Sequence, residues 1–76
     1  NPVLYRTLHG WRNKMAKEKG LPHYMILSIR AMITLANMAP SDLKEMAKIK
    51  GIGKRTLEKY GETLLSVIED SAGRSS

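Results

Sequence analysis

Apolar residues near both ends of the chain recur at intervals of three and four, the spacing that places side chains on one face of an α-helix. The first stripe consists of Leu4, Leu8, Trp11 and Met15, and the second of Leu57, Tyr60, Leu64 and Ile68. No segment shows the strict alternation of apolar and polar residues that is typical of a half-buried strand. The sequence therefore predicts an all-α domain with a helix near each end.

Helix boundaries are indicated by proline, glycine and serine at the expected places. Pro2 suits the first turn of the first helix, and Gly20 suits its end. Residues 23–38 are apolar nearly all round, which is typical of one or two short buried helices, with Ser28 as a candidate N-cap between them. After a proline, Ser41 is expected to cap the next helix.

Length and composition limit the fold and the chemistry. At 76 residues the chain forms one domain, close to the lower size at which a single core suffices without cross-links. There is no cysteine, so disulfides and cysteine-based zinc sites are excluded. The histidines are His9 and His23, and neither has metal-binding or catalytic spacing. We therefore expect no metal, no cofactor and no catalytic residue.

The charge balance favours a polyanionic partner. A net charge of +6 and a pI of about 9.9 attract nucleic acid at long range, although the same charge could serve solubility alone. The longest apolar stretch, residues 24–39, contains Arg30 and is too short and polar to span a bilayer. With no secretory leader apparent, we expect an intracellular protein of cytoplasm, nucleoid or nucleus, and no membrane partner. Because the chain begins at Asn1, we interpret it as a piece of a longer polypeptide.

A glycine-rich turn joins two helical patterns at residues 49–55, Ile-Lys-Gly-Ile-Gly-Lys-Arg. Such a turn lets the backbone approach a partner closely and opens the N-terminus of a helix, which favours an anion. Lys50, Lys54 and Arg55 add positive charge around the turn. A phosphate contact is one interpretation; the other is a tight connection in which glycine is needed only for its backbone conformation.

Several motifs occur in a familiar order along the chain. They are Trp11-Arg12, Leu21-Pro22-x-Tyr24, Pro40-Ser41, and Ile49-x-Gly51-Ile52-Gly53 leading to Tyr60-Gly61. This order resembles the HRDC domain (helicase and RNase D C-terminal), and the turn resembles a helix-hairpin-helix element. The resemblance covers about residues 3–70 and implies a compact five-helix bundle. The composition of residues 71–76 separately predicts a linker or disordered tail. One departure is Ile29, where the family commonly has an aspartate that caps the third helix.

The resemblance also implies a function. HRDC domains are accessory modules of RecQ-type DNA helicases and RNase D-type ribonucleases. These modules bind nucleic acid or dock on other domains. We expect a non-catalytic module of an ATP-dependent DNA helicase, monomeric in isolation, that contacts single-stranded or branched DNA. The alternatives are a regulatory module that docks on other domains of the parent helicase, and an RNA-binding module of an RNase D-type nuclease.

The predicted interface combines phosphate contacts with one possible stacking ring. Arg12 is expected to flank the apolar face of the first helix and reach outward, and Tyr24 could stack on a base or be half-buried. The lysines could track phosphates or form a solvated face, whereas Trp11, Tyr60 and the methionines are expected in the core. The predicted interface residues are Arg12, Lys14, Lys17, Lys19, Tyr24, Lys50, Gly51, Gly53, Lys54 and Arg55.

Overall fold

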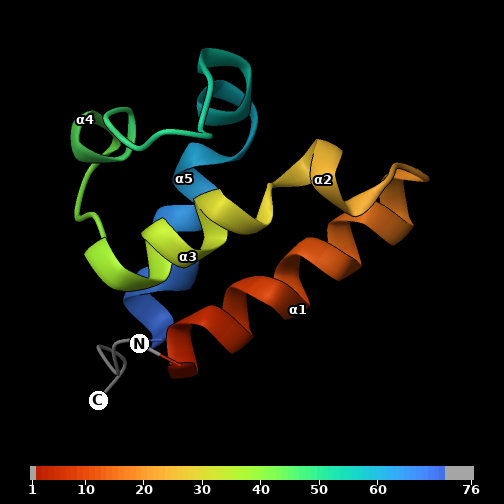
Figure 1. Cartoon of the computed structure of the whole chain (residues 1–76), viewed down its shortest axis with the longest axis horizontal. Helices are drawn as coiled ribbons and strands as arrows, with labels where there is room; N and C mark the ends of the chain where they lie inside the picture. The colour runs from red at the N-terminus through yellow and green to blue at the C-terminus, as the bar shows by residue number, and fades with distance from the viewer. Residues whose placement is uncertain (1, 72–76) are drawn as a thin grey trace.

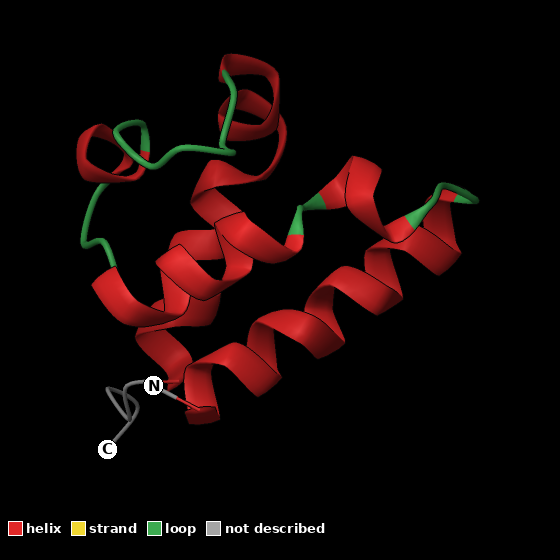
Figure 2. Cartoon of the chain, in the orientation of Figure 1, coloured by secondary structure: helices red, strands yellow, loops and turns green. Residues whose placement is uncertain are grey.

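A computed structural model describes residues 2–71 of the chain, which form five helices and, within this range, no strand (Figures 1 and 2). The helices are α1 (Pro2–Lys19), α2 (His23–Ile26), α3 (Ile29–Met38), α4 (Leu43–Met46) and α5 (Lys54–Ser71). The predicted all-α five-helix bundle is confirmed. Ser71 belongs to α5 rather than to a tail, and residues 72–76 lie outside the described part of the chain.

The two long helices organise the bundle. α1 packs against α2, α3 and α5, and α4 packs against α5. The first residues of α1 and the last of α5 lie at one end of the molecule, while α4 and the first turns of α5 lie at the opposite end (Figure 1). Burying each large aliphatic side chain of the core contributes about 1.5–3 kcal/mol. The largest fully buried side chains are Leu4, Leu8, Ile26, Met32, Leu35, Met46 and Leu64.

The start of α3 follows the sequence prediction. The hydroxyl of Ser28 accepts a hydrogen bond from the backbone N–H of Ala31 at 3.1 Å, so Ser28 is the N-cap. Ile29, which stands where the family commonly has an aspartate, is 57% exposed. The serine hydroxyl therefore caps α3 without help from its neighbour.

The start of α4 differs from the prediction by one residue. Asp42, not Ser41, is the N-cap: its carboxylate accepts from the backbone N–H of Glu45 at 2.8 Å. Ser41 instead donates from its backbone N–H and its hydroxyl to the Glu45 carboxylate, at 2.9 and 3.0 Å. The charged carboxylate of Asp42 is the stronger acceptor for a helix N–H, which explains why it takes the capping position.

The prediction that the methionines fill the core is only partly right. Met32 and Met46 are fully buried and Met15 is half-buried, but Met25 and Met38 are each 56% exposed. Met25 lies in the four-residue helix α2 and Met38 is the last residue of α3, positions at which the helix is not enclosed by neighbours.

The aromatic residues of the two long helices meet. The rings of Trp11 and Tyr60 pack edge to face, with centroids 5.5 Å apart and planes at 81°. Tyr60 is buried, as predicted, and Trp11 is half-buried against the core. This pair fixes α1 against the second turn of α5, because edge-to-face aromatic contacts add to the gain from burial.

Candidate nucleic-acid interface

The connection between α4 and α5, residues 47–53, is a compact turn anchored in the core. The backbone N–H of Ile49 donates to the carbonyl of Met46 at 3.1 Å, and that of Ile52 donates to Ile49 at 3.2 Å. The side chains of Ile49 and Ile52 are buried, at 3% and 7% exposure. Residues 47–53, called here the hairpin loop, are therefore held in place by apolar side chains rather than by their polar ones.

The two glycines of the hairpin loop have different roles. Gly51 has φ +97°, and a Cβ there would lie 3.2 Å from the Cβ of Ala31 and 3.3 Å from the hydroxyl of Ser28. The fold itself thus requires glycine at position 51, both for its backbone and for its contact with α3. Gly53 has no positive φ, and a Cβ there would meet nothing within 4 Å. The packing of the domain leaves open space beside Gly53.

Gly53 lies directly before α5, and its carbonyl accepts the first hydrogen bond of that helix from Leu57 at 3.0 Å. The backbone N–H groups of the first turn have no carbonyl before them within the helix, and they carry the positive end of the helix dipole. No acidic residue lies in this first turn, and Lys54 and Arg55 are both exposed. The start of α5 therefore presents N–H donors and positive charge beside the open space at Gly53.

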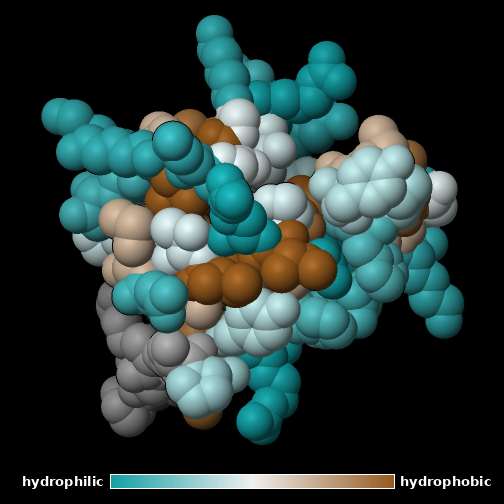
Figure 3. Space-filling model, in the orientation of Figure 1, coloured by the Kyte–Doolittle hydropathy of each residue, from teal (hydrophilic) through white to brown (hydrophobic). Residues whose placement is uncertain are grey.

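Exposed basic side chains surround the hairpin loop, which lies at the end of the molecule opposite the start of α1 (Figure 1). Figure 3 shows hydrophilic side chains projecting from this end. Two acidic residues lie in the adjoining segment, Asp42 and Glu45, and both carboxylates are occupied by the capping hydrogen bonds at the start of α4. Five exposed basic side chains face these two negative charges, so the surface has an excess of positive charge. It is called here the basic end and consists of Lys44, Lys48, Lys50, Gly53, Lys54 and Arg55.

The predicted lysines of α1 are exposed but do not form one surface. Lys19 lies beside α5, with its ammonium 5.7 Å from the centre of the Tyr60 ring, a cation–π distance. Lys17 is two residues earlier, which rotates it by about 200° around the helix, and Lys14 lies near the Lys17 side. The structure therefore brings Lys19 next to α5 and leaves Lys14 and Lys17 on another face of α1.

The expectation that Arg12 reaches outward is wrong. Its side chain is only 6% exposed, and its guanidinium donates to the backbone carbonyl of Leu27 at 3.2 Å. The reason is that the segment between α2 and α3 crosses this side of α1 and presents a carbonyl that needs a donor. The buried Nε of Arg12 has no hydrogen-bond partner among the described residues. Arg12 thus joins α1 to the α2–α3 connection instead of facing a ligand.

Tyr24 is more accessible than the half-buried alternative allowed, with 72% of its surface exposed in the short helix α2. An exposed ring of this kind is available for stacking.

Lys44 and Lys48 were not among the predicted interface residues. A signal was present, since Lys44 in the predicted helix and Lys48 after it are four residues apart, the spacing of neighbours on one helix face.

Two kinds of site are absent from the part of the chain that the structure describes. No group of three or more His, Cys, Asp or Glu side chains among residues 2–71 is close enough together to hold a metal ion. Among the same residues, no helix has the length and apolar character to cross a membrane.

Comparison with known families identifies the domain. The family model of the HRDC domain matches residues 1–68. The chain belongs to the HRDC domain family. A solved structure, described as D. radiodurans RecQ HRDC domain 3, matches with a TM-score of 0.88 and 30% identity, covering 92% of each chain. The resemblance seen in the sequence and the five-helix fold are thereby confirmed.

Relatives of known description include DNA helicases and proteins described as Ribonuclease D. The HRDC chain is 36% identical over 65 residues to the ATP-dependent DNA helicase UvrD2 of Mycobacterium tuberculosis, covering 86% of this chain and 9% of that protein. It is 29% identical over 69 residues to the ATP-dependent DNA helicase RecQ of Bacillus subtilis, covering 91% of this chain and 12% of the relative. The chain thus spans about a tenth of the length of these helicases.

Proposed function

We propose that this HRDC domain is a non-catalytic nucleic-acid-binding module of a larger DNA helicase, and that it holds single-stranded or partly unwound DNA through its phosphates. The relatives that it matches include proteins described as ATP-dependent DNA helicases and proteins described as Ribonuclease D, and this chain corresponds to only a small share of their length. The motor that hydrolyses ATP would lie in other domains of the parent. Such a module would work in the compartment that contains the cell's DNA.

The observation that carries this proposal is the basic end. Its lysines and arginine surround a turn whose conformation is fixed from inside by Ile49 and Ile52, so the binding surface is preorganised. The open space at Gly53 allows a phosphate to approach the first N–H groups of α5. Contacts of this type position a strand without reading its bases.

In this mechanism the N–H groups at the start of α5 hold one phosphate, while Lys50, Lys54 and Arg55 neutralise its neighbours. A module this small binds weakly, with a dissociation constant of about micromolar or more at physiological salt. Within a helicase the contact acts through a high effective concentration, since the motor domains already hold the same DNA. The domain would thereby select among substrates rather than provide the main anchor.

The test is a fluorescence-anisotropy titration of the domain with labelled oligo(dT), a duplex of equal length and oligo(rU), at several salt concentrations. We expect the single-stranded DNA to bind most tightly, with log K falling linearly with log salt by about 0.7 per neutralised phosphate. Preference for oligo(rU) would instead favour an RNA-binding role. Absence of binding at low salt would contradict the proposal.

Absence of binding would favour a docking role within the parent helicase. The observation in support of that role is an apolar band over α3 (Figure 3), where Ile29 and Ile33 are 57% and 46% exposed. Exposed apolar side chains that are grouped in this way are typical of protein contacts. The test for docking is binding of the isolated domain to the remainder of its parent.

A further inference from the structure

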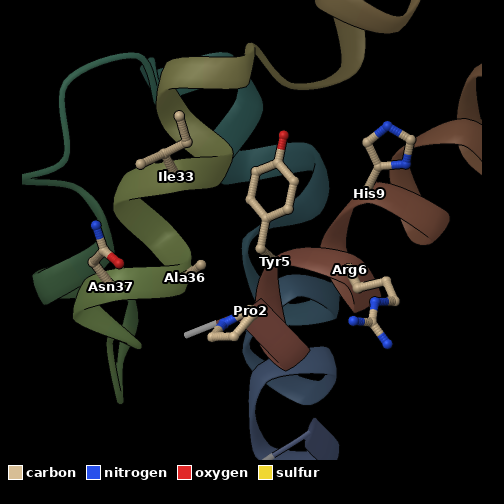
Figure 4. A pocket seen from close by; sticks show the side chains of 7 residues that line it. All are labelled: Pro2, Tyr5, Arg6, His9, Ile33, Ala36 and Asn37. Atoms are coloured by element: carbon tan, nitrogen blue, oxygen red, sulfur yellow. The ribbon is translucent and has the colours of Figure 1, made fainter.

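A cleft of about 590 Å³ lies between the first half of α1 and the second half of α3, away from the basic end (Figure 4). Its volume falls in the range of small-ligand sites, about 300–1,000 Å³. None of the interface residues predicted from the sequence belongs to it. The lining residues are Pro2, Tyr5, Arg6, His9, Ile33, Ala36 and Asn37.

Aromatic rings line the α1 side of the cleft. Tyr5 and His9 are four residues apart on one face of α1, and their ring centres are 6.2 Å apart with the planes at 37°. Tyr5 is half-buried: it packs on the core and also lines the cleft. In Figure 4 the Tyr5 ring lies in the middle of the cleft, between α3 on one side and Arg6 and His9 on the other. A planar aromatic guest would find a ring on which to stack.

The α3 side supplies an apolar wall and one polar group. Ile33 is 46% exposed, and Ala36 completes the wall behind it. Asn37 follows at the last turn of α3 with an exposed side-chain amide, which offers both a donor and an acceptor. Such an amide pairs with the polar edge of any nucleobase. The cleft thus combines the stacking, apolar and hydrogen-bonding surfaces that an unstacked base needs.

The charge around the cleft matches a phosphate. Arg6 is exposed at its edge, and none of the described lining residues is acidic. The chain as a whole carries a net charge of +6. We propose that the α1–α3 cleft takes one unstacked base of single-stranded DNA, with Tyr5 and His9 as stacking surfaces, Asn37 on the base edge and Arg6 on the adjoining phosphate. This inference rests on the proposed function and adds a base-contacting site to it.

One strand can serve both sites because α3 connects them. A Cβ added at Gly51 of the hairpin loop would meet Ser28 and Ala31 at the start of α3, whereas Asn37 lies at its end. Ala31 and Asn37 are six residues apart, an offset of about 9 Å along the helix axis. This offset corresponds to about three nucleotides at the stacked spacing of about 3.4 Å. Along the axis of α3, the two regions are therefore only a few nucleotides apart.

The test separates bases from phosphates with two labelled oligonucleotides of about eight nucleotides. One is oligo(dT), and the other has the same backbone with its central positions abasic. Both are titrated against the wild-type domain, Tyr5→Leu and His9→Ala; Leu keeps apolar bulk without a ring, and His9 is exposed, so folding of that variant is not at risk. Tyr24→Leu, which removes an exposed ring on α2, is the matched control.

We expect the wild-type domain to bind the abasic oligonucleotide about 5-fold to 150-fold more weakly than oligo(dT), the range for one stacked base. In Tyr5→Leu that ratio should fall close to one, and in His9→Ala it should shrink, while Tyr24→Leu should keep most of it. A ratio that survives Tyr5→Leu and His9→Ala and vanishes in Tyr24→Leu overturns the inference, because the base then stacks on α2.

The remaining outcomes distinguish this inference from the proposed function. If wild-type domain binds both oligonucleotides equally, the phosphate-binding function stands and the base site is wrong; the cleft then suits a protein segment instead. If neither oligonucleotide binds at low salt, both proposals are wrong.

Discussion

The basic end and the α1–α3 cleft lie against opposite ends of the same helix, α3. They differ in whether the residues that hold the structure are also those that meet the ligand. At the basic end, the residues that hold the turn, such as Ile52 and Gly51, are distinct from those that are free to meet a ligand, such as Gly53 and Lys54. In the cleft, Tyr5 does both, since it packs on the core and lines the opening.

This difference determines where ligand binding can be measured separately from stability. Substitution of an exposed lysine at the basic end changes charge without touching the core, so binding and stability can be measured apart. Substitution of Tyr5 alters packing and the cleft together, which is why its test depends on a ratio between two ligands rather than on affinity alone. A preorganised charged surface and a half-buried aromatic surface thus need different controls.

The largest expected effect is on DNA affinity at the basic end. Lys54→Ala with Arg55→Ala should weaken binding of oligo(dT) about tenfold or more at low salt, and should reduce the salt slope by about 1.4, two phosphates at about 0.7 each. The control is Lys14→Ala with Lys17→Ala on α1, which removes the same charge at a distance from the basic end and should change the salt slope little. Equal loss in both double variants would mean that only net charge matters.

The second effect separates fold from function within the hairpin loop. Gly51→Ala should lower the free energy of unfolding by about 3 kcal/mol, because a strained backbone and crowding against α3 act together. Gly53→Ala should lower the free energy of unfolding by no more than about 1 kcal/mol, because it replaces a glycine N-cap. It should nevertheless weaken DNA binding, because the new Cβ fills the open space. Urea unfolding and anisotropy measure the two quantities. A Gly53→Ala variant that is unstable but binds normally would reverse these roles.

A third change tests the buried arginine. Arg12→Met keeps most of the aliphatic stem but removes the donor to the Leu27 carbonyl, and should lower the free energy of unfolding by about 1–2 kcal/mol. DNA affinity of the folded variant should stay unchanged, since the guanidinium is buried. Lys14→Ala, at an exposed position of the same helix, is a suitable comparison, with unchanged stability expected to within about 0.5 kcal/mol. A stable Arg12→Met with poor DNA binding would contradict the assigned position of Arg12.

The smallest expected effect is an increase in the stability of the domain. Gly10 lies in the middle of α1, and a Cβ there would meet nothing within 4 Å. Gly10→Ala should therefore raise the free energy of unfolding by about 1 kcal/mol through helix propensity. Because the substitution strengthens the helix that lines the cleft without touching either binding region, DNA affinity should not change. Thermal unfolding checks the gain, and a lower melting temperature would mean that the space beside Gly10 is occupied.

Most of the fold could be predicted from the sequence because helical spacing, prolines and glycines are local signals. The ends of α1 and the Ser28 cap follow from such signals directly. The cap of α4 could not be predicted in this way, because Ser41 and Asp42 are adjacent and both suit the position. Only the geometry shows that the Asp42 carboxylate, and not the Ser41 hydroxyl, accepts from the Glu45 N–H.

The site was less predictable, because burial depends on tertiary packing. Periodicity places Arg12 beside the apolar face of α1 but does not reveal that the Leu27 carbonyl passes over it. Tyr5 and His9 are four residues apart in the sequence, yet the opposite wall of their cleft comes from α3, some 28 residues later along the chain between Tyr5 and Ile33. Of the charges around the hairpin loop, Lys50, Lys54 and Arg55 were predicted because they adjoin the glycines in sequence, whereas Lys44 and Lys48 were missed.

The central claim is that backbone N–H groups at the start of α5 hold a DNA phosphate. The most direct measurement is a two-dimensional ¹H–¹⁵N NMR titration of the domain with oligo(dT). We expect the largest amide shifts at residues 53–56, with a second group at Tyr5, Arg6 and Asn37 if the cleft takes a base. Largest shifts at Lys14 and Lys17, with residues 53–56 unmoved, would contradict it.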